Sequence, residues 1–356
     1  MQGRWIRIHI IFTSEIRKAL SAGRPTTLAI DGGHGSPQGS FAVYRRERRR
    51  SRGAAHRVTG AEGATRPKLT VILPSRNGAA TLPVQLEALA LQTWDEPWEL
   101  LVSDNGSTDE TTEVVGRFRG RIPGLRIVDA SARAGLPYAS NVAVRESRAP
   151  ALAFCNDDDE VAPGWLSAMG RALARQELVA GRLEHDKLNE DWMVAVRGRP
   201  QEDGLERWSV GTHLPFGFGC SLGIHRALHE AINGFDEEMF PAGEDVDYCW
   251  RAQYEGAKLQ FAPDAVTHYR LRGEWSSIYR QGRNYGIGDV LLYRKHRHLG
   301  LPKIPHRGRR AARAWLGIGK QFTLASSRVH RGLALWNLGW RTGMLEASLR
   351  NRVLLL

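Results

Sequence analysis

The sequence of 356 residues has no long hydrophobic run, and this absence argues against a membrane-spanning protein. No stretch approaches the ~18–20 consecutive apolar residues that a transmembrane helix needs. The apolar patch near the start of the chain, Ile8 to Phe12, is too short to be the core of a secretory signal. With 42% hydrophobic and 25% charged residues, the composition is that of a globular protein.

Cysteine is also scarce, and the pattern of the cysteines argues against two classes of protein, those stabilised by disulfides and those built on a cysteine zinc site. Cys155, Cys220 and Cys249 are odd in number and widely separated. This spacing gives neither a disulfide framework nor a zinc motif. It is typical of free thiols in a reducing compartment, so we expect a cytoplasmic protein.

The net charge of +12 is distributed unevenly along the chain. Residues 1–66 contain 13 Lys/Arg and 4 Asp/Glu, a net charge of +9, and residues 269–356 contain 18 and 3, a net charge of +15. Residues 67–268 contain 19 and 31, a net charge of −12. An acidic body can hold a cation, whereas basic ends suit anionic surfaces or acidic partners.

The three charge regions also differ in pattern. Residues 1–66 show no sustained periodicity and contain a Gly/Ser/Pro stretch, Gly32 to Gly39, which predicts a disordered basic N-terminal segment. From Lys68, apolar runs at 69–73, 99–102, 125–128 and 151–154 predict four strands, with helices between them that include 82–89 and 138–148. Ser107 to Glu110 has the pattern of a capping box that opens another helix toward Arg119. Strand–helix alternation of this kind predicts an α/β fold with a mostly parallel sheet flanked by helices.

Polar residues follow the predicted strands, where a parallel sheet binds its ligands. Asn156-Asp157-Asp158-Asp159 comes directly after the strand 151–154, and adjacent carboxylates repel one another unless a cation neutralises them. Carboxylate oxygens suit Mg²⁺ or Mn²⁺, although a solvated loop with helix-capping acids would have the same pattern. The turn after the strand 69–73 is Pro74-Ser-Arg-Asn-Gly78, which lacks the Gly-x-Gly-x-x-Gly of a dinucleotide-binding turn.

A second acidic cluster, Gly243-Glu244-Asp245-Val246-Asp247, follows Gly234-Phe235-Asp236. One of its carboxylates could bind a metal or act as a general base toward a hydroxyl group. Acids that merely open a helix over 246–254 explain the same pattern. His268 stands alone and could be a packed or solvated residue rather than a ligand.

In this order and spacing, the motifs resemble glycosyltransferase family 2, with its GT-A fold. The resemblance covers about residues 68–268, and a basic helical tail like 269–356 is frequent in the family. It implies a catalytic domain at 67–268 and a helical C-terminal extension at 269–356. It also implies an inverting, metal-dependent transfer of one hexosyl or deoxyhexosyl group from a nucleotide-diphosphate sugar to a hydroxyl acceptor. Cell-surface polysaccharide or glycolipid assembly is the expected setting, with a saccharide or lipid-linked acceptor.

Position by position, the resemblance implies roles for individual residues. Asp245 matches the general base. The donor-nucleotide positions are Pro74, Arg76, Asp104, Asn105, Gly135, Asn141 and Asp157. The metal positions are Asn156, Asp158 and His268, for Mn²⁺ or Mg²⁺, and the acceptor-side positions are Trp165, Glu244 and Asp247. Asn156 replaces the first acid of the family's Asp-x-Asp, and the shifted register Asp157-x-Asp159 stays open; Asp247 could instead cap a helix.

Two other functions remain open from the sequence. The basic ends, with a pI of about 10.0, could belong to a nucleic-acid-binding protein. Against this, phosphate repulsion would be strongest at the acidic clusters of the best-organised region, and we expect no nucleic-acid partner. Asn156 could mark a catalytically inactive relative that still binds a sugar nucleotide. Gln281-Gly-Arg-Asn284-Tyr285 departs from the Gln-x-x-Arg-Trp of processive synthases, which favours transfer of single sugars.

The C-terminal tail has an amphipathic pattern. Leu333, Trp336, Trp340 and Met344 recur at spacings that place them on one face of a helix. This face could pack on the catalytic domain. Alternatively, with the flanking arginines, it could hold the enzyme at the anionic inner surface of the cell membrane as a peripheral protein.

Overall fold

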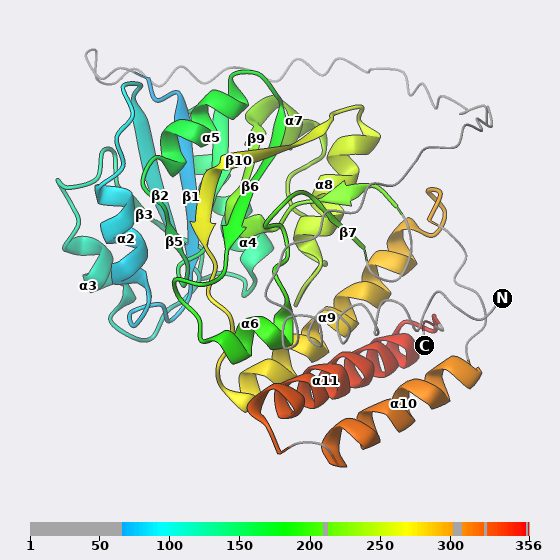
Figure 1. Cartoon of the computed structure of the whole chain (residues 1–356). Helices are drawn as coiled ribbons and strands as arrows, with labels where there is room; N and C mark the ends of the chain where they lie inside the picture. Colours follow the sequence, from blue (N-terminus) through cyan, green and yellow to red (C-terminus); the bar gives the residue numbers. More distant parts are fainter. Residues whose placement is uncertain (1–65, 209–212, 302–307, 324–325, 354, 356) are drawn as a thin grey trace, which may run out of the picture. The chain divides into compact units, whose positions relative to one another are not determined.

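The computed structural model describes residues 66–208, 213–301, 308–323, 326–353 and 355 (Figure 1). The helices and strands, in chain order, are β1 (Leu69–Ser75), α2 (Leu82–Ala90), β2 (Trp98–Asp104), α3 (Thr111–Gly116), β3 (Arg126–Asp129), α4 (Leu136–Glu146), β4 (Ala151–Phe154), β5 (Glu160–Val161), α5 (Trp165–Leu173), β6 (Leu178–Glu184), α6 (Asp191–Arg197), β7 (Glu206–Arg207), β8 (Pro215–Phe216), the 3₁₀ turn η1 (Gly219–Ser221), β9 (Leu222–His225), α7 (Arg226–Ala231), α8 (Glu244–Tyr254), β10 (Leu259–His268), α9 (Trp275–His296), α10 (Gly308–Thr323) and α11 (Arg328–Arg350). The predicted disorder of residues 1–66 lies outside the described residues, except for Arg66.

An eight-stranded sheet forms the centre, in the order β3-β2-β1-β4-β9-β6-β10-β5. Strands β1 to β4 pair in parallel, as do β6 and β10, whereas β9 runs antiparallel to its neighbours β4 and β6. The short edge strand β5 is antiparallel to β10. The mostly parallel α/β sheet predicted from the sequence is therefore confirmed, with one reversed strand in its middle.

The strands bury side chains on both faces, as strands covered on both sides must. On β1, Leu69, Val71 and Leu73 belong to the hydrophobic cluster that includes α2, α3 and α5 residues. Ile72 points the other way, into the larger cluster formed with residues of α4, α8 and α9. This period-two alternation explains why the apolar runs of the sequence are continuous.

One local prediction is wrong. The helix expected to open at the capping box begins instead at Thr111, and Glu110 makes no capping hydrogen bond through its side chain. Asp109 accepts hydrogen bonds from the backbone nitrogen atoms of Ala79 (3.1 Å) and Thr111 (3.1 Å). Asp109, which lies within the predicted capping box, therefore ties two loops together.

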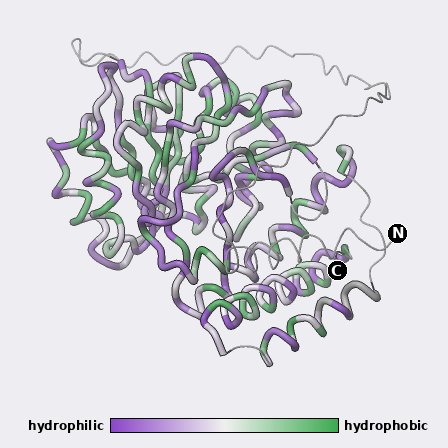
Figure 2. Tube along the Cα trace, viewed as in Figure 1, coloured by the Kyte–Doolittle hydropathy of each residue, from purple (hydrophilic) through white to green (hydrophobic). Residues whose placement is uncertain are grey.

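Helices α9 and α11 approach each other closely through glycines. Gly282 and Gly286 of α9 face Gly339 and Gly343 of α11, where an added Cβ atom would lie 2.0–2.5 Å from a backbone oxygen of the opposite helix. Only glycine permits this distance between two helices. Figure 2 shows hydrophobic and hydrophilic residues alternating along these C-terminal helices.

The apolar face of α11 packs inside the protein. Met344 is buried, and Trp340 packs against the same cluster, donating its indole N–H to Asp289 of α9 at 2.7 Å. Leu333 and Trp336 pack in a cluster with α6, where the Arg197 guanidinium lies 3.6 Å from the Trp336 ring centroid. The packing explanation of this face is therefore confirmed, and the membrane-facing interpretation of the same face is wrong.

The C-terminal helices and the sheet belong to one compact unit. This unit runs from Thr65 to Leu356. The described residues after β10 form the helices α9, α10 and α11, and residues of α9 and α11 belong to the core. Across the described part of the chain, none of the helices combines the length and hydrophobicity needed to cross a bilayer.

Candidate functional site

The carboxyl ends of β1 and β2 place two predicted donor-site loops side by side. Ser75 and Asp104 are partners in the strand register, and Asp104 accepts a hydrogen bond from the Ser107 backbone nitrogen at 3.1 Å. Asn77 joins the loops: its side chain accepts from the Thr108 backbone nitrogen at 2.8 Å. Asn77 has a φ of 55°, the left-handed region that asparagine tolerates better than most residues. Arg76 next to it is exposed and Pro74 partly buried.

Two of the predicted donor-site residues shape the loop that follows β3. The Asn105 side chain donates to the carbonyl oxygens of Ala130 (2.6 Å) and Arg133 (2.8 Å), and accepts from the Gly135 nitrogen at 2.8 Å. These three bonds use both N–H groups of the amide and one lone pair of its oxygen. The prediction that Asn105 contacts the nucleotide directly is corrected to a role in shaping this loop, and Gly135 is its anchor point, with a φ of 139°.

Asn141 is corrected in the same way. Its amide accepts from the Phe235 nitrogen (2.9 Å) and donates to the Phe235 oxygen (2.9 Å) and Glu237 (3.1 Å). The buried side chain therefore fixes the segment Gly234-Phe235-Asp236 against α4, which explains why an asparagine is needed there without any ligand.

The acidic cluster after β4 brings three carboxylates close together. Asp157 lies 2.6 Å from the Ser75 hydroxyl, which joins the cluster to the end of β1. Burial and the neighbouring charge of Asp158 raise the pKa of Asp157 to about 6. Burial also raises the pKa of Asp159 well above its usual range, and one of its oxygens has no hydrogen-bond partner among the described residues. A cation placed here would relieve this repulsion.

Asp158 faces an arginine. One of its carboxylate oxygens lies 2.6 Å from the Arg272 guanidinium, in the loop between β10 and α9. Arg270 of the same loop donates to the Asp158 carbonyl oxygen at 2.7 Å, and its backbone nitrogen donates to the Asp159 carboxylate at 2.8 Å. Asp159 is buried, with one oxygen held by this loop, and the register Asp157-x-Asp159 stays an alternative prediction.

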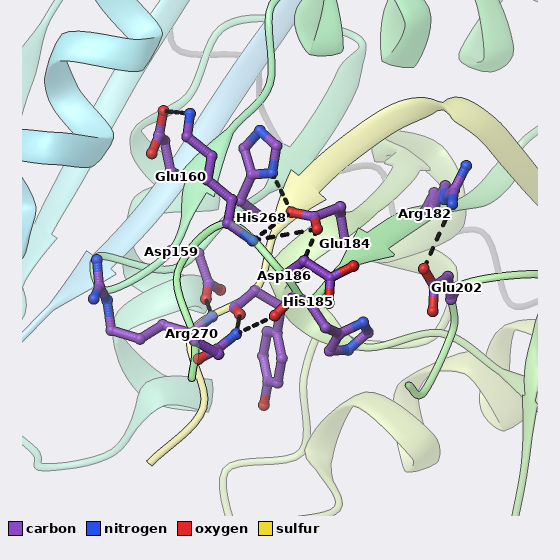
Figure 3. Close-up of polar contacts among 12 residues, drawn as sticks. Asp159, Glu160, Arg182, Glu184, His185, Asp186, Glu202, His268 and Arg270 are labelled. Atoms are coloured by element: carbon purple, nitrogen blue, oxygen red, sulfur yellow. Dashed lines mark hydrogen bonds and ion pairs between the residues drawn. The ribbon is translucent and has the colours of Figure 1, made fainter. Parts of the chain in front are cut away.

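His268 lies at the end of β10 and contacts Glu184 at the end of the neighbouring β6 (Figure 3). Its Nδ1 atom is 2.6 Å from a Glu184 carboxylate oxygen. Glu184 also accepts from the backbone nitrogen of Asp186 at 2.6 Å, so the carboxylate is itself held in place. With Nδ1–H donated to Glu184, the lone pair of His268 lies on Nε2, which no described residue binds. Metal-ligating histidines have this arrangement.

Asp245 lies in the first turn of α8 and is held by backbone nitrogen atoms. It accepts from Gly219 at 3.2 Å and from Val246 at 2.8 Å. Burial raises the pKa of Asp245, and burial together with the Asp245 charge raises the pKa of Glu244 to about 8. The ionised Asp245 carboxylate, held by these two N–H groups, is a candidate proton acceptor.

Cys220 shows that the two acidic clusters lie on one side of the protein. Burial raises the pKa of its thiol, and the charges of Asp159, Asp245 and Asp158 raise it further. Cys220 belongs to η1, which leads into β9, and β9 pairs with β4. The fold therefore brings the acids after β4 and the acid opening α8 to the same end of the sheet.

Two predicted acceptor-side residues are buried and cannot contact an acceptor. Trp165 is fully buried in the hydrophobic cluster around α5, with its indole 3.3 Å from the Ser221 hydroxyl. Asp247 is also fully buried, and it contacts His296 at 2.9 Å and Arg251 at 2.7 Å. Burial alone would raise the pKa of Asp247, but these partners and Lys295 lower it to about 2. Both assignments are wrong, since the side chains stabilise α5 and α8.

The residues fit a divalent cation. Within the described ranges, no three His, Cys, Asp or Glu side chains form a cluster that could hold a metal alone. Mg²⁺ typically uses one or two carboxylates together with substrate phosphates and water, so a complete protein cage is not required. Asp158 and the Nε2 atom of His268 are the protein atoms that suit such an ion. The Asn156 carbonyl oxygen accepts from Gln85 at 3.0 Å, so its backbone already has a structural partner.

Sequence reasoning missed three residues near these groups. Arg272 and Glu184 carry no motif, and only the pairing of β10 with β6 brings Glu184 to His268. Tyr285 of α9 is close enough to Asp245 and Glu244 that their charges raise its pKa, after the larger effect of burial. Its place at the end of the sequence Gln281 to Tyr285 was a signal that could have identified it.

Comparisons with known proteins identify the family. A model of "Glycosyl transferase family 2" matches residues 70–232. The uncharacterized glycosyltransferase YibD of Escherichia coli (strain K12) is 32% identical over 250 residues, which cover 64% of this chain and 67% of that protein. The uncharacterized protein y4gI of Sinorhizobium fredii is 27% identical over 230 residues, 57% of this chain and 24% of that protein.

A solved structure shows the same fold. The mannosyltransferase PcManGT from Pyrobaculum calidifontis, in complex with GDP-Man and Mn²⁺, superposes with a TM-score of 0.54 at 19% identity, over 79% of this chain and 88% of that chain. This likeness confirms the GT-A type of α/β fold. The motifs, the sheet and the relatives lead to one assignment: the chain belongs to glycosyltransferase family 2.

Proposed function

We propose that this protein transfers a single sugar from a nucleotide-diphosphate sugar to a hydroxyl acceptor, with inversion at the anomeric carbon and with Mn²⁺ or Mg²⁺ bound. The observation that carries the proposal is the position of Asp245 beside the acids that follow β4. Asp245 accepts a hydrogen bond from Gly219 of η1 at 3.2 Å, and Leu222, directly after η1, pairs with Phe154 at the end of β4. A proton acceptor and the acids that suit a cation lie at one end of the sheet, where α/β proteins bind their ligands.

The donor nucleotide would occupy the loops at the ends of β1 and β2. Asp104 and the exposed Arg76 border this region, and Asn77 holds its two loops together. A bound Mn²⁺ or Mg²⁺ supplies Lewis-acid stabilisation to the departing diphosphate. Asp158 and His268 are the residues that would hold it. Support for a metal comes from PcManGT, whose structure contains Mn²⁺ and a nucleotide sugar.

Asp245 performs the proton transfer in this proposal. The acceptor hydroxyl oxygen attacks the anomeric carbon, the bond from that carbon to the diphosphate oxygen breaks, and the hydroxyl proton passes to the Asp245 carboxylate. Hydrogen bonds from Gly219 and Val246 fix the carboxylate so that it needs no reorientation. General-base catalysis of this kind contributes about 10²–10⁴-fold to the rate.

We infer that the acceptor is a saccharide or a lipid-linked sugar of cell-surface polysaccharide or glycolipid assembly, and that the protein acts in the cytoplasm at the inner face of the membrane. The buried, unpaired cysteines Cys155, Cys220 and Cys249 suit a reducing compartment.

The experiment is a panel of nucleotide-diphosphate sugars incubated with the purified protein and Mn²⁺, Mg²⁺ or EDTA. With water as the acceptor in this assay, we expect release of the nucleoside diphosphate from one donor, dependent on the metal, and a freshly released sugar of inverted anomeric configuration by NMR. A retained configuration would contradict the mechanism. Equal release in EDTA would contradict the role of the metal.

A further inference from the structure

Helix α10 differs from its neighbours α9 and α11 in how its apolar residues are used. It packs on α11 through one side only: Ile318 is buried, and Gln321 accepts a hydrogen bond from Asn337 of α11 at 3.1 Å. In Figure 1, α10 is the outermost of the three C-terminal helices. The helix therefore has a second side that the described residues leave uncovered.

Three large apolar residues of α10 lie on that uncovered side. Trp315, Leu316 and Phe322 are 38%, 75% and 42% exposed. At about 100° per residue, Phe322 lies nearly in line with Trp315, and Leu316 lies about 100° further around. They form a continuous apolar edge beside the contact with α11, not scattered single residues.

The charge next to this edge is uniformly positive. The sequence 308–323 contains Arg309, Arg310, Arg313 and Lys320 and no acidic residue. Arg313 and Lys320 are exposed, and neither forms an ion pair with another described residue. By helical spacing they lie on the far side of Leu316 from Trp315, next to the apolar edge.

Several cations of the neighbouring helices form ion pairs. Arg283 of α9 pairs with Glu346, Lys295 of α9 with Asp236, and Arg328 of α11 with Glu190. Helix α10, in contrast, has no acidic residue of its own to compensate its positive charge. A surface that combines exposed tryptophan, leucine and phenylalanine with unpaired cations is complementary to an anionic lipid headgroup layer over acyl chains.

We propose that α10 is a membrane-docking surface, and that it lies in the interface of a bilayer that contains anionic lipid. Trp315, Leu316 and Phe322 enter the boundary between headgroups and acyl chains, while Arg313 and Lys320 contact lipid phosphates. Helix α10 packs on α11, and Arg328 at the start of α11 pairs with Glu190, six residues after β6 ends at Glu184. This contact connects the helical layer to the end of the sheet that carries the acidic clusters. Docking there would hold the proposed site near lipid-linked acceptors.

The test is flotation of the full chain with vesicles, and it needs no sugar donor, so its outcome is independent of the proposed transfer reaction. We expect the protein to float with vesicles of phosphatidylcholine that contain 30 mol% phosphatidylglycerol at low salt, and to stay at the bottom with phosphatidylcholine alone. Leu316→Glu combined with Phe322→Ser should lower the partition coefficient at least about tenfold. Arg313→Glu combined with Lys320→Glu should have a similar effect, which added salt reduces.

Matched controls come from the other side of the protein. Leu91 is 70% exposed, and Arg117 and Arg175 are exposed. Leu91→Glu and the pair Arg117→Glu with Arg175→Glu should float like the unaltered protein. Flotation that is equal for the α10 variants and the controls would overturn the proposal. So would a change of sedimentation with Leu316→Glu in the absence of lipid, because that result would assign the apolar edge to a second copy of the chain.

Discussion

His268 and Glu184 face each other across the parallel strands β10 and β6, with the imidazole Nδ1 atom 2.6 Å from a carboxylate oxygen. Because the backbone of the turn after β6 also binds Glu184, the carboxylate cannot follow the ring if the ring rotates. The pair therefore fixes the orientation of the imidazole and its tautomer. Only Nε2 remains free to bind an ion.

Removing Glu184 should weaken metal binding without removing a metal ligand. We expect Glu184→Ala to lower the affinity for Mn²⁺ about 10–100-fold in the presence of a nucleoside diphosphate, measured by calorimetry, with partial recovery in Glu184→Gln. Glu160 is the matched control, since it is the partner of His268 on the other side of β10 and contacts Lys187 instead. Equal losses in Glu184→Ala and Glu160→Ala would show a general effect of charge and contradict the orientation argument.

Amide substitution of the two carboxylates that open α8 should reduce turnover strongly at Asp245 and only slightly at Glu244. Asp245→Asn removes the proposed base and should reduce turnover by at least ~10²-fold, with donor binding nearly unchanged. Glu244→Gln should retain most of the activity, because a pKa of about 8 already keeps Glu244 largely protonated at neutral pH. Initial rates and calorimetric donor binding measure both variants. Turnover above about a tenth of the original in Asp245→Asn would refute the assignment.

Arg272 should compete with a cation for Asp158. In Arg272→Ala the carboxylate loses its partner at 2.6 Å, so we expect tighter binding of Mn²⁺ alone. Binding of a nucleoside diphosphate should become weaker, because a guanidinium beside the site favours phosphate. Calorimetry with each ligand separately measures the expected increase in Mn²⁺ affinity and the expected decrease in nucleoside diphosphate affinity. Arg280→Ala, on the exposed side of α9, should change neither affinity.

The sequence was most informative where function depends on short motifs along one strand. The apolar runs of 69–73 and 151–154 predicted β1 and β4 correctly, because both strands are buried on two faces. Asp158 and Asp245 could be identified from residues near them in sequence. Glu184 and Arg272 could not, because their partners lie 84 and 114 positions away and the contact exists only once β10 pairs in the sheet.

Trp165 and Asp247 show the opposite failure. Both lie within motifs, and a motif does not say whether a residue binds substrate or holds the helix that carries the site. Burial separates the two roles: both side chains are fully covered. The apolar face of α11 was ambiguous for the same reason, because such a face suits a membrane and a protein core equally. The glycines of α9 and α11 show which helix packs against it.

These glycines give a test of the helix packing. Gly286→Ala should destabilise the protein by about 1–3 kcal/mol, because the new Cβ atom would lie 2.1 Å from the Trp340 carbonyl oxygen. Gly319→Ala on α10 meets nothing within 4 Å and should stabilise by roughly 0.5–1 kcal/mol, the difference in helix propensity between the two residues. Urea unfolding of both variants measures the free energies. The same sign for both substitutions would contradict the close contact.

Asp289 should make stability depend on pH. Its two oxygens accept hydrogen bonds from the indoles of Trp208 and Trp340, both at 2.7 Å. Burial raises the pKa of Asp289 to about 6, although the two indoles oppose this effect. Because the folded protein holds this proton more tightly than the unfolded chain, the resulting stabilisation is complete below about pH 4 and is lost as the pH rises through 6.

Asp289→Asn should remove this dependence, since an amide does not titrate. The free energy of unfolding of the unaltered protein should therefore fall relative to that of Asp289→Asn by on the order of 2–3 kcal/mol between pH 4 and pH 7. Urea unfolding at intervals of half a pH unit measures the difference. Asp203→Asn, at an exposed position, should give a constant offset across the same range. A constant difference, like that of the Asp203 variant, would contradict this prediction, because it would show that the pKa of Asp289 in the folded protein is near that of an exposed aspartate. A difference that rises with pH would also contradict it, because it would show that folding lowers the pKa of Asp289.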